Sequence, residues 1–433
     1  MSSAGAHARS RRRPAPGDEA LSRLPEEWKA TMAALGHAAY RGDQVFRWIH
    51  QRGVVDPAAM TDLSKALRTS LASELDLPLQ TERVHEATDG TRKLLVRLGD
   101  AAPVETVLLP AQGGAALHAD ASTADHDDDD DVREADVAKS GRRRHGRSPR
   151  GRHRPRHRRP PPSTPSQTMT DRDPAVRVTQ CISTQVGCAM GCVFCASGVA
   201  GLTRHMTPGE IVGQVLLGRR HLQPGEAIRN VVFMGMGEPL HNFEGTVRAI
   251  ELLTHPDGLG LSPRRITVST SGLIPEIERL GARFEGRVGL AISLHQPDDA
   301  RRSALMPINR KYPLPRLVEA LRAYPLPRGR KITIEYTLVA GQNDRDEDAD
   351  RLARLLRGLR VKINLIPMNP IEASRLGPPP PSRVDTFQRR LQRAGYLCFV
   401  RRRRGDDVAA ACGQLAMIGK KPNRAFERRQ PAG

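Results

Sequence analysis

The feature that most constrains the fold is a regular alternation of strand-like and helix-like segments from residue 176 onward. Runs rich in β-branched residues recur about every 30 residues, with helical stretches between them. Strands that alternate with helices in this way predict βα units and a parallel sheet. Six or seven units make most of a barrel, so the sequence predicts an α/β fold with a partial (βα)6-type barrel over residues 175–418. The predicted strands are 176–182, 230–235, 264–270, 287–293, 331–338, 362–368 and 397–402.

The first helix of this barrel has a clear start signal in Thr207-Pro208-Gly209-Glu210. A threonine followed three residues later by glutamate is a capping-box pattern, and proline suits the first helical position. Chemistry in barrel folds takes place at the C-terminal ends of the strands, on the loops that lead into the helices. The loop after the first strand is therefore where this sequence predicts an active site.

That loop carries Cys188, Cys192 and Cys195 in the spacing C-x3-C-x2-C. Three thiolates on one tight loop can hold three corners of a [4Fe–4S] cluster, which normally takes four cysteines, so one iron would stay open to another ligand. A zinc ribbon is the alternative. Structural zinc takes four ligands, usually from two cysteine pairs, and the six cysteines of the sequence include no second pair of that kind.

Polar residues also stand at the ends of other predicted strands. Gly237 and Glu238 follow the second strand in Met-Gly-Met-Gly-Glu-Pro-Leu, where a third glycine is missing, so a Rossmann dinucleotide site is disfavoured. Polar strand ends of this kind can bind a small cofactor, whereas turn or strand-end capping is the alternative for each one separately. The further candidates are Ser269, Ser293, Leu294, His295 and Asn369.

Two smaller regions precede the barrel. Residues 19–80 show helical apolar periodicity and predict a small helical domain, either packed on the barrel as a plain bundle or in direct contact with RNA. Residues 81–111 predict a small β element, with 104–110 as a short strand.

Three segments lack the residues that a core requires. Only 38% of the sequence is hydrophobic and 3% aromatic. Residues 1–18 predict a disordered tail, 419–433 a basic tail, and 112–174 a disordered insertion with an unbroken acidic run at 127–131 and a basic stretch after it. A solvated polyampholyte is favoured there over metal binding by the acidic run or by His145, His153 and His157. The basic half of the insertion is a candidate for added RNA affinity.

The overall charge and the cysteine count indicate the setting. A formal net charge of +20 points to a polyanionic partner such as nucleic acid. Six cysteines, half of them in one motif, favour a reducing compartment over a disulfide scaffold. The sequence shows neither an apolar signal-peptide region nor a run of about 18 apolar residues, so we expect a cytoplasmic protein without a membrane span.

Two further cysteines make the pattern specific. One opens Cys181-Ile-Ser-Thr-Gln-Val-Gly, directly before the cluster motif, and the other lies in Ala-Ala-Cys412-Gly-Gln-Leu near the C-terminus. Together with Gly-Met-Gly-Glu-Pro-Leu and Ser-Leu-His, these motifs resemble the RlmN-type methyltransferases of the radical S-adenosylmethionine (SAM) superfamily, over residues 20–110 and 175–418. The resemblance implies that the open iron binds SAM and that Glu238 holds its amino group.

The resemblance also implies a reaction, methylation of adenine C2 in 23S rRNA and in tRNA. Cys412 would be methylated by one SAM, and a second SAM would supply the radical that activates this methyl group. The activated carbon would add to adenine, after which Cys181 resolves the protein–RNA adduct and Glu105 accepts the proton. It further implies an electron donor such as flavodoxin or ferredoxin, and we expect a monomer.

Two other functions remain open from the residues. A resistance-type relative that methylates C8 of the same adenine shares the cluster, the cysteines and the barrel. A non-catalytic Fe–S RNA-binding protein is the second possibility, although mere binding would need neither Cys181 nor Cys412. The sequence departs from the family pattern in the insertion, which separates Glu105 from the strand that leads to Cys181. Arg401 to Arg404 are candidates for phosphate contact, and Cys398 is predicted to lie in the core.

Overall fold

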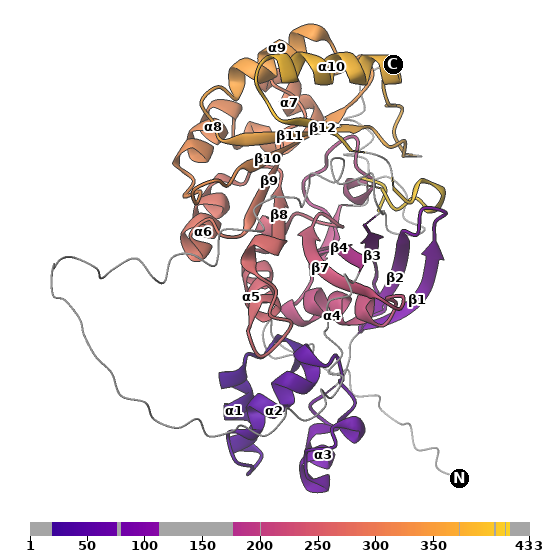
Figure 1. Cartoon of the computed structure of the whole chain (residues 1–433), viewed down its shortest axis with the longest axis vertical. Helices are drawn as coiled ribbons and strands as arrows, with labels where there is room; N and C mark the ends of the chain where they lie inside the picture. The colour runs from indigo at the N-terminus through magenta and orange to yellow at the C-terminus, as the bar shows by residue number, and fades with distance from the viewer. Residues whose placement is uncertain are drawn as a thin grey trace, which may run out of the picture.

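A computed structural model describes residues 20–75, 79–111, 176–199, 201–371, 373–401, 404–411 and 413–415. The predicted tail 1–18, the insertion 112–174, the basic tail 419–433 and Cys412 lie outside these residues. Helices cover one side of a long curved sheet, and a small helical region stands at its lower end (Figure 1).

The barrel strands form where the sequence predicted them. All seven pair in parallel, in the order β4-β7-β8-β9-β10-β11-β12. The predicted partial barrel is therefore confirmed. The strands are β4 (Val176–Cys181), β7 (Glu226–Phe233), β8 (Ile266–Thr270), β9 (Gly289–Ser293), β10 (Ile332–Leu338), β11 (Val361–Pro367) and β12 (Cys398–Val400).

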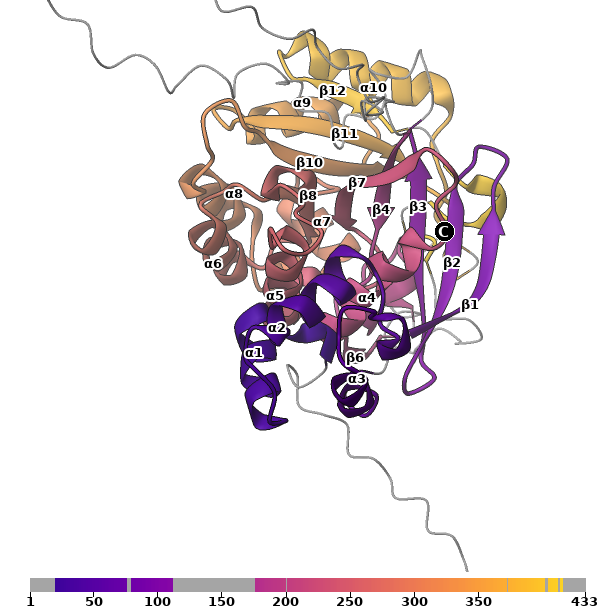
Figure 2. The same ribbon diagram turned by 60° about the horizontal axis from the view of Figure 1, so that its bottom comes forward.

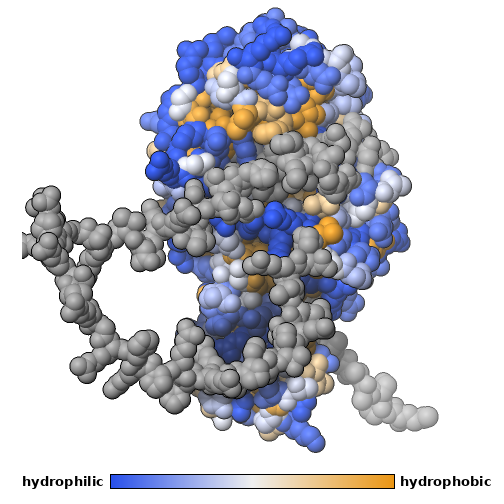
Figure 3. All heavy atoms as spheres, viewed as in Figure 1, coloured by the Kyte–Doolittle hydropathy of each residue, from blue (hydrophilic) through white to orange (hydrophobic). Residues whose placement is uncertain are grey.

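Helices connect these strands and cover the sheet. They are α4 (Pro208–Arg219), α5 (Phe243–Thr254), α6 (Ile274–Phe284), α7 (Asp299–Leu305), α8 (Leu314–Ala323), α9 (Asp346–Leu355) and α10 (Pro381–Arg393). Short 3-10 turns lie at Ala196–Gly198, Pro239–Asn242, Pro263–Arg265, Pro307–Arg310 and Asp406–Val408. The surface over α9 and α10, at the top of the view, is largely hydrophilic (Figure 3). No helix in the described part of the chain is both long enough and apolar enough to cross a bilayer.

The small β element does not stand apart but extends the barrel sheet. β1 (Leu79–Glu86), β2 (Arg92–Leu98) and β3 (Pro103–Pro110) pair antiparallel with one another, and β3 pairs antiparallel with β4. The result is one sheet of ten strands, whose antiparallel part is seen beside β4 and β7 in Figure 2. In this register Val107 lies opposite Cys181, so Glu105 reaches the segment that follows β4. A second sheet consists of β5 (Gln185–Gly187) and β6 (Leu202–His205).

The N-terminal region packs directly on the barrel. It contains a 3-10 turn at Ala20–Ser22, α1 (Pro25–Ala34), α2 (Arg41–Phe46), a π-helical turn at Arg47–Gln51, a 3-10 turn at Pro57–Ala59 and α3 (Lys65–Leu71). Trp28, Phe46 and Ile49 are fully buried and belong to the same hydrophobic cluster as the barrel strands. Arg47 also forms an ion pair with Asp257, beyond the end of α5. The helical region and the barrel therefore share one core.

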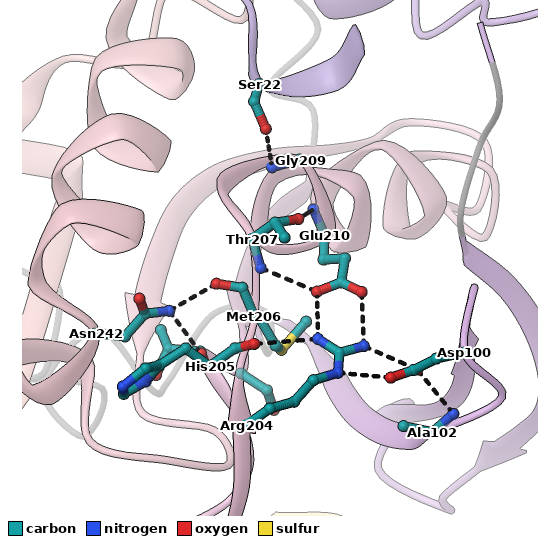
Figure 4. A network of polar contacts seen from close by, with 12 residues as sticks. Ser22, Asp100, Ala102, Arg204, His205, Met206, Thr207, Gly209, Glu210 and Asn242 are labelled. Atoms are coloured by element: carbon teal, nitrogen blue, oxygen red, sulfur yellow. Dashed lines mark hydrogen bonds and ion pairs between the residues drawn. The ribbon is translucent and has the colours of Figure 1, made fainter. Parts of the chain in front are cut away.

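The predicted capping box at α4 is confirmed and lies in a larger polar network (Figure 4). The Glu210 amide donates to Oγ1 of Thr207 at 3.2 Å, and the Thr207 amide donates to the Glu210 carboxylate at 2.9 Å. Arg204 joins that carboxylate to Asp100, in the turn between β2 and β3. At the same helix start the Gly209 amide donates to Oγ of Ser22. The start of the first barrel helix thus connects the barrel both to the N-terminal helical region and to the antiparallel strands.

Candidate functional site

One pocket lies at the C-terminal ends of the barrel strands, and nearly all the predicted cofactor residues line it. They come from the cysteine loop and from the ends of β7, β8, β9 and β11, which are distant in sequence. Leu294 is the exception, because it is fully buried behind the wall and its amide donates to the Glu335 carbonyl. The predicted residues in the lining are Cys188, Cys192, Cys195, Gly237, Glu238, Ser269, Ser293, His295 and Asn369.

The cysteine loop is held by backbone bonds to its surroundings. The Cys188 amide donates to Gly201, and the Val193 amide donates to Leu305 at the end of α7. Burial is the main reason that the pKa of Cys188 lies well above its usual value and that of Cys192 is raised to about 12, and the neighbouring thiols add to it. A bound cation reverses this effect, because it stabilises the thiolate form.

The donor set is one that an iron–sulfur cluster takes. A cubane cluster binds each cysteine to a different iron and normally takes four cysteines, so three thiols leave one iron open to another ligand. Three soft sulfur ligands around one pocket are the donors that iron–sulfur clusters take.

The Gly-Met-Gly turn needs both of its glycines. A Cβ on Gly235 would stand 2.7 Å from the Ile182 carbonyl, and one on Gly237 would stand 2.6 Å from Cβ of Gln185. Gly237 also has a φ of +104°, which side chains rarely adopt. The backbone of this turn can therefore lie directly against the segment between β4 and β5, which places Glu238 at the pocket wall.

Glu238 is buried and held from several directions. Its Oε2 accepts from both the amide and the hydroxyl of Ser271 at 2.8 Å, and its Oε1 accepts from the Leu240 amide at 3.1 Å. Burial raises the pKa of this carboxyl, while the bonds from Ser271 act in the opposite direction. The Glu238 amide donates to Gln185, which also bonds to His205 and His241. A fixed carboxylate of this kind can bind an amino group.

His295 is a neutral imidazole in the pocket. Its Nδ1 accepts from the Thr337 amide at 2.9 Å, which leaves the proton on Nε2. Burial lowers its pKa to about 3, with Arg302 as a second cause, so the ring stays uncharged at neutral pH. Its backbone has a positive φ of 57°, and Phe194 of the cysteine loop packs against the ring edge.

Sequence reasoning missed Arg302, which lies behind this wall. Its side chain is fully buried on α7 and donates to the carbonyls of Leu294, Ser293 and Ser271. A fourth bond runs to Oδ1 of Asn309 at 2.6 Å. Arg302 therefore ties the ends of β8 and β9 together below the pocket. No motif marked it, because an arginine on a predicted helix is normally a surface residue.

The predicted proton acceptor, Glu105, lies away from the pocket lining. Its carboxylate is buried and forms an ion pair with Lys93 at 3.0 Å. Lys93 also donates to the Ala409 carbonyl at 3.2 Å. Ala409 belongs to the loop that leads to Cys412, and Asp89, Thr88 and Pro110 bind the same loop. The antiparallel strands and the turn between β1 and β2 thus bind residues of the segment that precedes Cys412 in the chain. Cys181 is buried beside them, and Cys398 is a core residue, as predicted.

Comparisons with known proteins agree with this geometry. A model described as the radical SAM superfamily matches residues 182–353, and one described as the ribosomal RNA large subunit methyltransferase N-terminal domain matches residues 24–77. The chain is 61% identical to the dual-specificity RNA methyltransferase RlmN of Sorangium cellulosum (strain So ce56), over 93% of this chain and 96% of that protein.

Two more distant relatives extend the comparison. The probable dual-specificity RNA methyltransferase RlmN of Moorella thermoacetica is 40% identical over 92% of this chain and 97% of its own length. The crystal structure of a radical SAM methyltransferase from Sphaerobacter thermophilus superposes with a TM-score of 0.74 and 39% identity, over 92% of this chain and 98% of that one. Radical SAM enzymes carry a [4Fe–4S] cluster and use SAM, which the three thiols and the strand-end pocket fit. The chain belongs to the RlmN family of radical SAM RNA methyltransferases.

Proposed function

We propose that this enzyme methylates C2 of adenine in 23S rRNA and in tRNA, in a reducing cytoplasm, and that two SAM molecules are used per turnover. The observation that carries the proposal is the pocket, which joins three cysteine thiols and a fixed carboxylate at the strand ends of a barrel. Membership of the RlmN family favours the C2 product over the C8 product of the resistance-type relative.

The pocket residues would bind the cofactors. Cys188, Cys192 and Cys195 would hold the [4Fe–4S] cluster, which supplies the electron for reductive SAM cleavage when it is bound. Glu238 would accept the amino group of SAM, because Ser271 and Leu240 already fix its carboxylate toward the pocket wall. Gly237 lets this turn approach, and the other proposed SAM contacts are Ser269, Ser293, Leu294, His295 and Asn369. Leu294 could contribute only through its backbone, since its side chain is fully buried.

Cys412, Cys181 and Glu105 would do the chemistry on the RNA base. Adenine C2 is not nucleophilic, so a soft thiolate at Cys412 would accept the methyl group first and carry it to the base. Once the radical that SAM supplies has removed one hydrogen atom from this methyl group, the carbon would bond to C2, and Glu105 would take the C2 proton as the adduct gives up one electron. Cys181 would then bond to the Cys412 sulfur, and the carbon released from that sulfur would keep the electron pair of the broken bond and take up a proton to complete the methyl group. The ion pair with Lys93 supports this role, because the lysine holds the carboxylate and also bonds to the loop that leads to Cys412.

Each region of the chain has a proposed role in binding or modifying RNA. We propose the helical region 19–80 as an RNA-binding domain, the antiparallel strands 81–111 as the support of the C-terminal loop, and residues 175–418 as the catalytic barrel. We further propose a monomer that receives electrons from a flavodoxin or ferredoxin. The sequence's positive charge supports binding to phosphates, which positions a substrate without reading its bases.

One experiment tests the reaction. The anaerobically reconstituted enzyme is incubated with SAM, a reductant and a 23S rRNA fragment, and the nucleosides are identified by mass spectrometry beside a Cys412→Ala variant. We expect 2-methyladenosine with the wild-type enzyme and none with the variant. A product of 8-methyladenosine would overturn the C2 assignment, and SAM cleavage without any methylated adenosine would point to another substrate.

A further inference from the structure

A second carboxylate lines the pocket, and neither the family motifs nor the predicted contacts include it. Glu335 lies on β10 in register with Ser293 of β9 and with Asn364 of β11. Partners in such a register project to the same face of a sheet, and Ser293 and Glu335 both line the pocket. Glu335 therefore belongs to the inner wall, next to a proposed SAM contact.

The two oxygens of this carboxylate have different surroundings. Oε1 accepts from the Asn364 side-chain amide at 3.1 Å. Oε2 is buried and has no hydrogen-bond partner among the residues that the structure describes. Glu335 as a whole is only 3% exposed. Because buried polar atoms are nearly always bonded, an orphaned carboxylate oxygen in a pocket indicates a donor that arrives with a ligand.

The charge environment shows which kind of donor fits. Burial raises the pKa of Glu335, while Arg401, Asn364 and Lys362 act in the opposite direction. Arg401 also lines the pocket. The carboxylate thus already has cations near it, and its open oxygen suits a neutral N–H or O–H donor. A nucleoside offers such donors in its ribose hydroxyls and in the amino group of adenine.

We propose that Glu335 binds an adenosine in this pocket by accepting a hydrogen bond from a ribose hydroxyl or from the adenine amino group. Two adenosines enter the site, that of SAM and that of the RNA substrate, and both offer this chemistry. The second source rests on the proposed function, whereas the first requires only that the enzyme binds SAM.

The test uses the reconstituted holoenzyme with Glu335→Gln and Glu335→Ala. Tyr336→Phe is the matched control, because Tyr336 lies on the same strand and bonds to the Asn343 carbonyl instead of lining the pocket. Dissociation constants for SAM are measured by equilibrium dialysis without RNA, and kcat and KM are then measured with a 23S rRNA fragment. We expect Glu335→Ala to raise either the SAM dissociation constant or the RNA KM by about tenfold, and Tyr336→Phe to leave both within about twofold.

The two arms separate the sources. A higher SAM dissociation constant assigns the bond to the cofactor's adenosine and holds even if the enzyme proves to make another product. A higher RNA KM at an unchanged SAM dissociation constant assigns it to the target adenosine.

Thermal unfolding of the protein without cluster or SAM excludes a purely structural role. If the orphaned oxygen waits for a ligand, Glu335→Gln should leave the unliganded protein as stable as before or more stable, since it removes a buried charge. Unchanged SAM and RNA constants in both variants, or an effect of Tyr336→Phe equal to that of Glu335→Ala, would overturn the proposal.

Discussion

The barrel pocket and the groove between α5 and α6 differ in how their charged side chains are partnered. Glu335 lines the barrel pocket and keeps one oxygen open, and Arg302, buried behind the pocket wall, donates its hydrogen bonds to neutral oxygen atoms. The groove between α5 and α6 is lined by charged side chains that are paired with each other, such as Arg279 with Glu244 and Arg283 with Glu251.

This difference in partners indicates which of the two sites needs a ligand. A solvated ion pair already satisfies its own groups, and its free energy is small. A buried charge that lacks a full set of partners raises the free energy of the empty protein, so it is kept where a ligand or cofactor completes it. The open oxygen of Glu335 in the barrel pocket has this property, whereas the paired charges of the groove do not.

The largest effect is expected from Arg302, the most buried of these groups. Arg302→Met removes four hydrogen bonds, three of them to carbonyls at the ends of β8 and β9, of which the Leu294 carbonyl keeps the Gln296 amide as a donor. We expect the variant to lose on the order of 3 to 5 kcal/mol of stability, whereas Arg302→Lys keeps the charge and loses less. Urea unfolding of the protein without cluster measures both. Equal losses would show that the charge itself contributes nothing.

Lys93 tests the intermediate case, a charge that is partly buried and paired. Lys93→Met leaves the Glu105 carboxylate without its cation, although Glu105 retains a further interaction. We expect a loss of about 2 to 3 kcal/mol and a fall in methylated RNA that exceeds any fall in SAM cleavage. Quantifying 5′-deoxyadenosine and methylated adenosine in the same reaction checks this. A parallel fall in both products would instead place Lys93 before the proton transfer.

His50 extends the comparison to a buried group outside the pocket and the groove. Neither ring nitrogen of His50 has a hydrogen-bond partner within the described ranges. Burial lowers the pKa of His50 to about 3, with His255 as a second cause. An unfolded histidine takes up its proton near pH 6.5, so the unfolded state binds more protons between that pH and about pH 3. Stability should therefore fall as the pH drops through this range, by about 1.4 kcal/mol per unit for each such group.

Replacing this residue should reduce that pH dependence. We expect His50→Leu to flatten the fall in melting temperature between about pH 6.5 and pH 4.5 without abolishing it, because His295 has the same lowered pKa and stays in place. Calorimetry of the protein without cluster, at several pH values, provides the measurement. A slope equal to that of the wild type would mean that His50 is protonated in the folded state.

The smallest effect is expected in the groove. Arg279 and Glu244 form an ion pair at 2.6 Å, but both side chains are more than half exposed. Arg279→Ala should change the unfolding free energy by less than about 1 kcal/mol, and the change should shrink further in high salt. Denaturation in low and high salt checks this. A loss comparable to that of Arg302→Met would break the distinction between the pocket and the groove.

Local patterns were enough to predict the barrel and most of its pocket. Runs rich in β-branched residues and the capping box at Thr207 depend on neighbours in sequence, so the strands and α4 form where these patterns stand. The cysteine loop and the strand-end residues followed, because parallel strands bring their C-terminal ends to one edge.

Only the tertiary structure determined the remaining contacts, since they depend on register and packing between distant segments. The pairing of β3 with β4 carries Glu105 to the segment after Cys181, across a long stretch of intervening sequence. Burial of Arg302 follows from the packing of α7 against the cysteine loop, and the open oxygen of Glu335 follows from its place between β9 and β11. The sequence by itself determined the fold class and the cluster motif, because both depend on the spacing of residues that are close together in the sequence. The tertiary structure determined the partners of the buried charges, because those partners come from other strands and helices and approach only when the chain folds.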